Sequence, residues 1–215
     1  DELLGRMCCK CNGEDLGRLR AAFEFAREAH SPQKRKSGEP YIIHPVNVAR
    51  IVAEELELGV DPVIAAFLHD VVEDTPYTIE DIKERFGEDV AFLVGVVTKE
   101  KKDKYIQSKQ VDNFRQILAS MQYDVRALLI KLADRLEVMR EPGIFPPETR
   151  RQKSWESMNL YAPIAHKLGL YALKSELEDL ALKWLEPKDY EYITRRLEET
   201  ESERQTFIAR FIAPI

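Results

Sequence analysis

Apolar residues recur at intervals of three and four along almost the whole chain, and this spacing constrains the fold more than any other feature. Such a period places apolar side chains on one face of an α-helix, which has 3.6 residues per turn. No stretch alternates apolar and polar residues between hairpin turns, and only 9 of the 215 residues are glycine. The pattern therefore predicts an all-α fold of about ten helices.

Polar or proline-rich connections separate the predicted helices. Asp61 stands before a proline at one helix start, Thr78 precedes Asp81 by three residues as in a capping box, and Pro187 opens another helix. The proline-rich segment 141–147 is a candidate subdomain boundary. We expect helices at residues 15–30, 45–57, 61–74, 78–86, 88–97, 107–120, 124–140, 148–167, 170–183 and 187–210.

Composition limits the classes of partner. Hydrophobic residues make up 44% of the chain, enough to bury a core without disulfides. The formal net charge of -6 gives no overall positive field for nucleic acid or an anionic membrane surface. No apolar run approaches the roughly 20 residues of a membrane span, and the N-terminus lacks a signal-peptide pattern. We expect a cytoplasmic protein that binds neither membrane nor nucleic acid.

The N-terminal segment carries all three cysteines, Cys8, Cys9 and Cys11. No second Cys or His pair at metal-ligand spacing accompanies them, so reduced thiols without a metal are the simpler interpretation.

The chain starts at Asp1 rather than Met and stops directly after a helical pattern. We therefore expect a piece of a longer protein.

The expected helix 61–74 places an imidazole and three carboxylates on one face. At about 100° per residue its large apolar residues fall within an arc of roughly 140°, which predicts a side that faces the core. His69, Asp70, Glu73 and Asp74 fall on the opposite side. On this helix alone, a solvated acidic face is the simpler interpretation.

Asp134 lies on an apolar stripe of another expected helix, with Ile130 four residues before it and Val138 four residues after. A buried carboxylate is costly unless a cation or a metal compensates it. Lys131 or Arg135 is one possible partner. The alternative is that Asp134 belongs to a metal site.

His44 stands before a proline at a helix start, where a lone histidine is usually structural. Counted with His69, Asp70 and Asp134, it gives two imidazoles and two carboxylates. Such a mixed set suits Mn(II), Fe(II) or Zn(II) more than calcium, and it leaves coordination positions open for water.

Three cations lie beside a glycine in segment 34–38, shortly before His44. Arg35 can bind a phosphate in a bidentate manner, Lys36 supplies a point charge, and Gly38 allows close approach of the backbone. A charge run is often simply solvated. Its place beside a candidate ligand in an acidic chain makes an anion-binding loop an equal alternative.

Several segments resemble, in order and spacing, those of the hydrolase domain of the Rel/SpoT alarmone enzymes, within the HD superfamily named for its His-Asp pair. Their joint occurrence, over residues 18–200, is more specific than one such pair. The resemblance implies an HD-type metallophosphohydrolase bundle that degrades the bacterial stringent-response alarmones ppGpp and pppGpp. The segments are 35–45 (RKSGEPYIIHP), 67–75 (FLHDVVEDT), 131–136 (KLADRL), 161–169 (YAPIAHKLG) and 176–180 (ELEDL).

The resemblance also implies the roles of individual residues. Removal of the 3′-pyrophosphate, giving GDP or GTP, would depend on Mn(II). Glu73 and Asp74 would orient and deprotonate water. Arg35 and Lys36 would bracket the guanine base and the phosphates, with Ser37 in the same loop. The metal ligands would be His44, His69, Asp70 and Asp134.

Glu137 and Val138 depart from the family, which usually carries His-Asn at these two positions. The asparagine normally contacts the substrate ribose, so substrate affinity or nucleotide preference is in question here. Members of the family commonly carry an alarmone synthetase domain after the hydrolase. We accordingly expect an N-terminal extension (1–14), a hydrolase domain (15–185) and a helical connection (186–215) toward a synthetase domain absent from this sequence.

Two alternatives stay open. An HD phosphohydrolase of another nucleotide would use the same metal, but the loop 35–38 has no reason to recur there. A catalytically weak module that senses nucleotide and regulates a synthetase is the second. The intact Glu73–Asp74 pair argues against such a module, and Val138 argues mildly for it.

Overall fold

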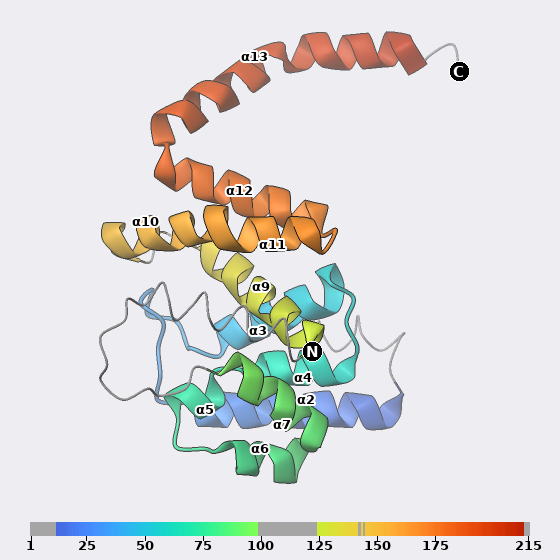
Figure 1. Ribbon diagram of the computed structural model, residues 1–215, viewed down its shortest axis with the longest axis vertical. Coiled ribbons are helices and arrows are strands. Elements are labelled where there is room, and N and C mark those ends of the chain that lie inside the picture. The colour runs from blue at the N-terminus through green and yellow to red at the C-terminus, as the bar shows by residue number, and fades with distance from the viewer. Residues whose placement is uncertain (1–11, 99–123, 142, 144, 213–215) are drawn as a thin grey trace. The chain divides into compact units, whose positions relative to one another are not determined.

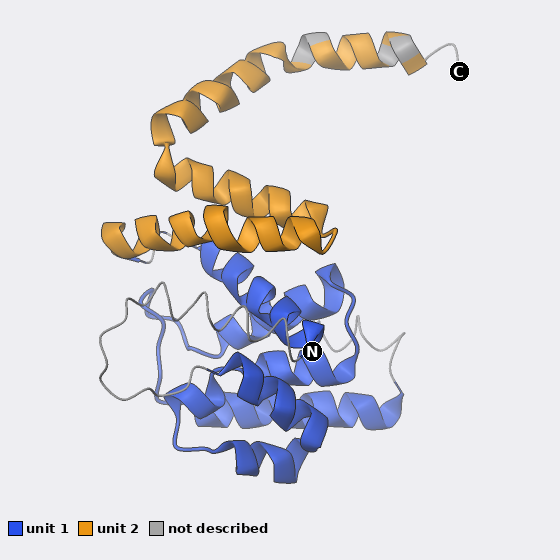
Figure 2. Cartoon of the chain, viewed as in Figure 1, with its two compact units in different colours: residues 1–145 blue, residues 146–215 orange. Residues whose placement is uncertain are grey.

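The computed structural model describes residues 12–98, 124–141, 143 and 145–212. Within these ranges the secondary structure is helical apart from one isolated antiparallel bridge between Lys34 and Pro40. The all-α prediction is therefore confirmed for the described part of the chain. The chain divides into two compact units, residues 1–145 and 146–215, and the division falls inside the proline-rich connection (Figure 2).

The described helices of unit 1 are α2 (Gly13–Ala29), α3 (Ile43–Arg50), the π-helical turn η1 (Ile51–Glu55), α4 (Val60–Leu68), α5 (Val71–Asp74), α6 (Ile79–Phe86), α7 (Glu88–Val97) and α9 (Val125–Arg140). The centre of this unit is α4, which contacts α2, α3, α7 and α9 (Figure 1). Every residue from Pro62 to Leu68 is buried, so α4 is covered on all sides. Helices that contact α4 are thereby brought close to each other.

The helices with strong local signals match their predictions closely. Thr78 and Asp81 form the expected capping box at the start of α6: each side chain accepts a hydrogen bond from the other residue's backbone N–H. Asp124 caps α9 by accepting from the Arg126 N–H at 2.7 Å. The expected helix 107–120 lies outside the described residues.

The prediction of one helix over 61–74 was wrong. Helix α4 ends at Leu68, His69 and Asp70 form a turn, and α5 begins at Val71. The His69 imidazole donates through Nδ1 to the Ala66 carbonyl at 2.7 Å. In a continuous helix the Asp70 N–H would bond that carbonyl, so the side chain competes with the helix for it.

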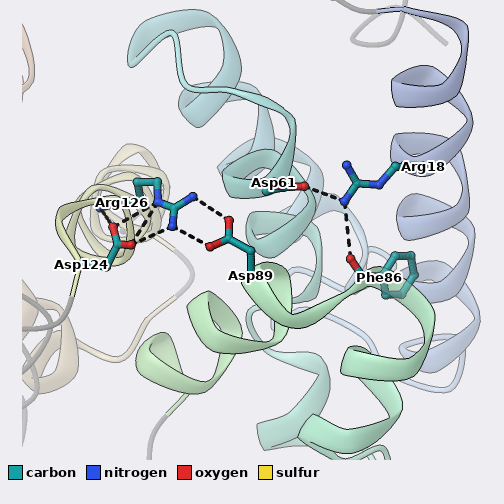
Figure 3. A network of polar contacts seen from close by, with 6 residues as sticks. All are labelled: Arg18, Asp61, Phe86, Asp89, Asp124 and Arg126. Carbon is teal, nitrogen blue, oxygen red and sulfur yellow. Dashed lines mark hydrogen bonds and ion pairs between the residues drawn. The ribbon is translucent and has the colours of Figure 1, made fainter.

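The prediction of Asp61 as an N-cap was also wrong. Helix α4 starts at Val60 with Gly59 before it. Asp61 instead accepts a hydrogen bond from the Arg18 guanidinium of α2 at 2.6 Å (Figure 3). The aspartate therefore joins two helices rather than capping one.

A second network in Figure 3 fixes the start of α9. The Arg126 guanidinium donates to both Asp89 oxygens of α7, at 2.7 and 2.8 Å, and to Asp124 at 2.8 Å. Bidentate pairs of this kind hold both position and orientation. The network sets the position of α9 against α7.

The helices of unit 2 are α10 (Pro147–Glu156), the π-helical turn η3 (Ser157–Tyr161), α11 (Ala162–Lys167), α12 (Tyr171–Leu185) and α13 (Pro187–Ile212). The π-turn η3 precedes Pro163, which lacks the N–H of a regular α-helical turn. Helix α12 packs against α10, η3 and α11, and the Arg150 guanidinium lies 4.0 Å from the centre of the Trp184 ring. Pro187 opens α13, as the sequence predicts.

Among the described residues, we find no helix with the length and apolar character needed to cross a membrane.

Candidate metal centre

Two buried histidines face each other in the interior of unit 1. His44 lies in the first turn of α3, His69 directly follows α4, and their ring centroids are 5.2 Å apart. These positions follow from the packing of α3 against α4. Because a carbonyl can only accept, the bond to Ala66 requires His69 Nδ1 to carry its proton, and His69 Nε2 is left for the site.

Two carboxylates complete the cluster. The Asp70 Oδ2 atom is 3.5 Å from His44 Nε2 and 3.1 Å from His69 Nε2. The Asp134 Oδ1 atom of α9 is 3.3 Å from His44 Nε2. Ligand atoms of His44, His69 and Asp70 all lie within 4.8 Å of one another. The structure thus places all four residues of the predicted ligand set in one cluster.

His69 Nε2 provides a test of whether these residues suit a metal. It is buried, and it has no well-aligned hydrogen-bond partner among the described residues although the Asp70 carboxylate is close. A buried nitrogen left in this state is costly unless a ligand takes its lone pair. Two imidazole nitrogens and two carboxylates form a donor set that fits a divalent metal ion.

The charges in the cluster shift its pKa values strongly. Burial alone would lower the pKa of His44, but the carboxylates of Asp134 and Glu137 outweigh it and raise the pKa to about 10. Burial would raise the pKa of Asp70, yet His69 and then His44 hold it well below its usual range. The pKa of Asp134 is lowered in the same way, first by His44. Without a metal, protons on the imidazoles balance the carboxylates.

Asp134 of α9 approaches His44 of α3, with Oδ1 3.3 Å from His44 Nε2. Lys131, a partner suggested by the helix alone, also contributes to the lowered pKa of Asp134, though less than His44 does. Ile130 on the same stripe is buried as expected, and Val138 is half-buried. The carboxylate therefore points toward the cluster rather than into a purely apolar layer.

Tyr41 and Glu137 hold the ligands, and sequence reasoning missed both roles. The Tyr41 hydroxyl donates to Asp70 Oδ2 at 2.6 Å, and its pKa is raised by burial and by that carboxylate. Glu137 Oε2 lies 2.5 Å from His44 Nδ1. Tyr41 contacts a ligand 29 residues further along the chain, and Glu137 contacts one 93 residues before it. No local spacing in the sequence therefore indicates either contact.

Residues 34–38, the cationic loop, differ at Arg35 from the anion-binding loop that the sequence predicts. The Arg35 side chain is buried, and its two terminal nitrogens lie 3.0 Å from Glu137 and 3.1 Å from Glu141. Lys36 is exposed, with Nζ 5.5 Å from the centre of the Phe145 ring. Of the two cations predicted to contact substrate, only Lys36 extends from the surface, and Arg35 is neutralised by carboxylates.

Ser37 is also exposed, and its hydroxyl donates to the Glu39 carboxylate at 3.1 Å. The turn closes through a bond from the Arg35 N–H to the Glu39 carbonyl at 2.8 Å. Gly38 has φ 91°, a left-handed conformation that suits glycine. The glycine therefore shapes this turn.

Glu73 and Asp74, the predicted acid–base pair, lie on α5 and not on the element that carries His69. Glu73 is half-buried and Asp74 is exposed. The Asp74 carbonyl accepts a hydrogen bond from Gln33 Nε2 at 2.7 Å, which joins α5 to the segment before the cationic loop. The backbone N–H of Asp74 bonds the Asp70 carbonyl at 2.9 Å, so the pair stays one turn from a ligand.

Comparison with known proteins points to one family. The family model described as "HD domain" matches residues 22–171. The chain is 46% identical over 198 residues to a guanosine-3′,5′-bis(diphosphate) 3′-pyrophosphohydrolase of Aquifex aeolicus, covering 91% of this chain and 28% of that protein. It is 43% identical to the bifunctional (p)ppGpp synthase/hydrolase SpoT of Escherichia coli, covering 94% and 29%. The chain thus spans less than a third of these relatives.

A solved structure is similar as well. The chain matches a metazoan ortholog of SpoT that hydrolyses ppGpp, with a TM-score of 0.60 and 31% identity over 76% of this chain and 93% of that one.

Proposed function

The chain belongs to the HD-domain family, in its Rel/SpoT group, and from this premise we propose that it hydrolyses ppGpp and pppGpp to GDP and GTP with release of the 3′-pyrophosphate. One observation carries the proposal. Two imidazoles and two carboxylates from three separate parts of unit 1 converge around a buried, unsatisfied nitrogen. Relatives named for this reaction supply the substrate class.

His44, His69, Asp70 and Asp134 would hold the metal ion, and we assign Mn(II) to this set of nitrogen and oxygen donors. A bound divalent ion would polarise a phosphoryl oxygen and make a water molecule more acidic. The two carboxylates balance the charge of such an ion if both imidazoles are neutral. Tyr41 orients Asp70 through its hydroxyl.

Glu73 and Asp74 would receive the proton from water. Their helix α5 begins directly after the ligand Asp70, and the backbone bond between Asp74 and Asp70 keeps the pair close to the metal set. Glu73 is half-buried, which favours a defined position, while the more exposed Asp74 can pass a proton to solvent.

Lys36 and Ser37 are exposed in the cationic loop, and we assign them to the phosphates of the substrate. Arg35, the buried member of the same loop, also belongs to the proposed substrate site. Its guanidinium could bind a phosphate by exchanging the half-exposed Glu141 for it while keeping the buried Glu137.

Release of pyrophosphate from ppGpp by the purified chain tests the proposal. We expect turnover with added Mn(II), none with excess chelator, and recovery when Mn(II) is restored. The His69→Ala variant is the matched negative control because it removes one ligand. Bound metal with no turnover of ppGpp or pppGpp would overturn the proposal.

A second candidate, a weak nucleotide-sensing module, is favoured by one observation. Glu137 stands where the family usually carries His and engages Arg35, a residue that the resemblance assigns to substrate. Such a module would release no pyrophosphate but would still bind ppGpp, which calorimetric titration of the purified chain with ppGpp measures. The two measurements together separate the two functions.

The parent protein would carry a synthetase domain after this chain, in the cytoplasm. The Escherichia coli relative is named as bifunctional, and this chain covers 29% of it. We keep residues 15–185 as the hydrolase domain and 186–215 as the connection, with the boundary between α12 and α13. Synthesis of ppGpp from GDP and ATP, or of pppGpp from GTP and ATP, by the full-length protein but not by this chain would be the supporting result.

A further inference from the structure

Glu137 is the most completely engaged buried carboxylate next to the proposed metal site. Its side chain is 3% exposed, and three groups approach it. Oε2 lies 2.5 Å from His44 Nδ1, and Oε1 lies 3.0 Å from Arg35 Nη2 and 3.4 Å from Asn47 Nδ2. Each oxygen thus has its own partner.

The contact with His44 determines what that histidine can do on its other side. Since an ionised carboxylate only accepts hydrogen bonds, His44 Nδ1 must carry the proton. His44 Nε2, which faces Asp70 and Asp134, then offers its lone pair to a metal when the ring is neutral. A carboxylate behind a histidine ligand also fixes the ring and increases its basicity.

Arg35 makes a carboxylate possible at this depth. A buried glutamate without a cation would be costly or would take up a proton. The Arg35 side chain, 5% exposed, compensates Glu137 from the side opposite to His44. Arg35 also contacts Glu141, whose side chain is 42% exposed. The contacts of Arg35 with Glu137 and of Glu137 with His44 connect the cationic loop to the proposed metal ligands.

We propose that Glu137 is a positioning residue for the metal ligand His44 and that Arg35 acts by compensating Glu137. This inference rests on the metal site of the proposed function. It assigns Glu137 no contact with substrate.

Mn(II) binding to the metal-free protein tests the inference without any substrate. The probe is free Mn(II), whose electron paramagnetic resonance signal disappears on binding. We expect Glu137→Ala to weaken Mn(II) binding about 10- to 100-fold, as loss of an outer partner does. Glu137→Gln should lose less, because its amide oxygen can still accept from His44, although its NH₂ group removes the acceptor of Arg35 and Asn47.

Glu141→Gln is the matched control. It removes a carboxylate from the same arginine but makes no contact with His44, so its Mn(II) affinity should stay within about twofold of the parent chain, well below the effect expected for an outer ligand partner. The downfield Nδ1–H proton resonance of His44 is a second readout. It should be present in the parent chain and in Glu141→Gln and lost in Glu137→Ala.

The outcomes separate this inference from the proposed function. Equal Mn(II) affinity in the parent chain, Glu137→Gln and Glu137→Ala overturns the role of Glu137 alone. Mn(II) binding with the expected losses but no turnover of ppGpp overturns the hydrolase proposal alone. A parent chain that binds no Mn(II) overturns both. Thermal unfolding identifies a variant that fails to fold, and the isosteric Glu137→Gln then decides.

Discussion

The start and the middle of α9 carry two clusters of ionisable side chains that differ in how completely they are satisfied. At the start of the helix, Arg126 binds Asp89 and Asp124 through bidentate contacts, and the side chains are partly exposed. Further along, Asp134 meets a buried imidazole cluster in which His69 Nε2 lacks an aligned partner among the described residues. The first cluster is complete with protein groups alone, and the second is not.

This difference indicates that the Arg126 cluster stabilises the fold and that the histidine cluster binds a ligand. Partly exposed ion pairs contribute modestly to stability and leave nothing for a ligand to satisfy. A set of two buried imidazoles and two half-buried carboxylates that leaves a buried nitrogen without an aligned partner is costly for the fold unless something binds there.

The largest effect is expected for Asp134→Ala. Loss of a direct ligand should weaken Mn(II) binding by more than the roughly 10- to 100-fold that an outer partner contributes, and pyrophosphate release should fall to background. Mn(II) titration and the ppGpp assay measure the two effects. Asp124→Ala, at the start of α9, is the control and should keep both. Full activity in Asp134→Ala would refute the ligand set.

Glu73→Gln should separate proton transfer from metal binding. The substitution removes a proton acceptor on α5 but none of the proposed ligands, so Mn(II) affinity should stay unchanged while kcat falls about 10²- to 10⁴-fold. Glu80→Gln, an exposed carboxylate on α6, serves as control. If Mn(II) affinity falls as well, Glu73 is a metal ligand. If kcat is unchanged, Glu73 is not the proton acceptor and Asp74 takes that role.

Local signals allowed much of the fold to be predicted. The capping box at Thr78 and the cap at Asp124 depend on residues within three positions, and both helix starts were predicted well. The break after Leu68 was missed because the side chain of His69 takes a carbonyl from the backbone. Apolar periodicity contains no information about that competition.

The site could be predicted in part for a related reason. His69 and Asp70 lie on a polar face that by itself predicts only solvation, and His44 or Asp134 taken alone had a structural interpretation. Only their joint occurrence and the family resemblance predicted a ligand set. The partners of Arg35 lie about a hundred residues further along the chain, on α9 and just after it. Only the packing of α3 against α9 brings such groups together, and a charge run alone predicts a solvated loop.

Changes of pH should affect the incomplete cluster most between neutrality and pH 10. The pKa of His44 is raised from 6.5 to about 10 in the metal-free fold. A raised pKa stabilises the fold fully below the unfolded value, and this contribution is lost as pH rises through the folded value. The stability of the metal-free protein should therefore decline from about pH 6.5 to 10, measured as the unfolding midpoint.

Metal binding should show the opposite trend, because a metal must displace the proton from His44. Mn(II) affinity should rise about tenfold per pH unit for each displaced proton over the same window. Calorimetry in buffers of different ionisation enthalpy counts the protons released. A pH-independent affinity between pH 6.5 and 9 would show that His44 is already neutral without metal.

The smallest effect is expected for Arg126→Ala, in the complete cluster. The substitution removes the guanidinium that Asp89 and Asp124 share. Both carboxylates then lose their cation. Because the guanidinium is about a third exposed, we expect a loss of about 1 kcal/mol in the free energy of unfolding, measured by urea denaturation. Mn(II) affinity should not change, since the metal set is held from α3 and α4 as well as α9. A clear loss of metal affinity would mean that the start and the middle of α9 are coupled, and the Arg126 network would then belong to the metal site rather than to the fold alone.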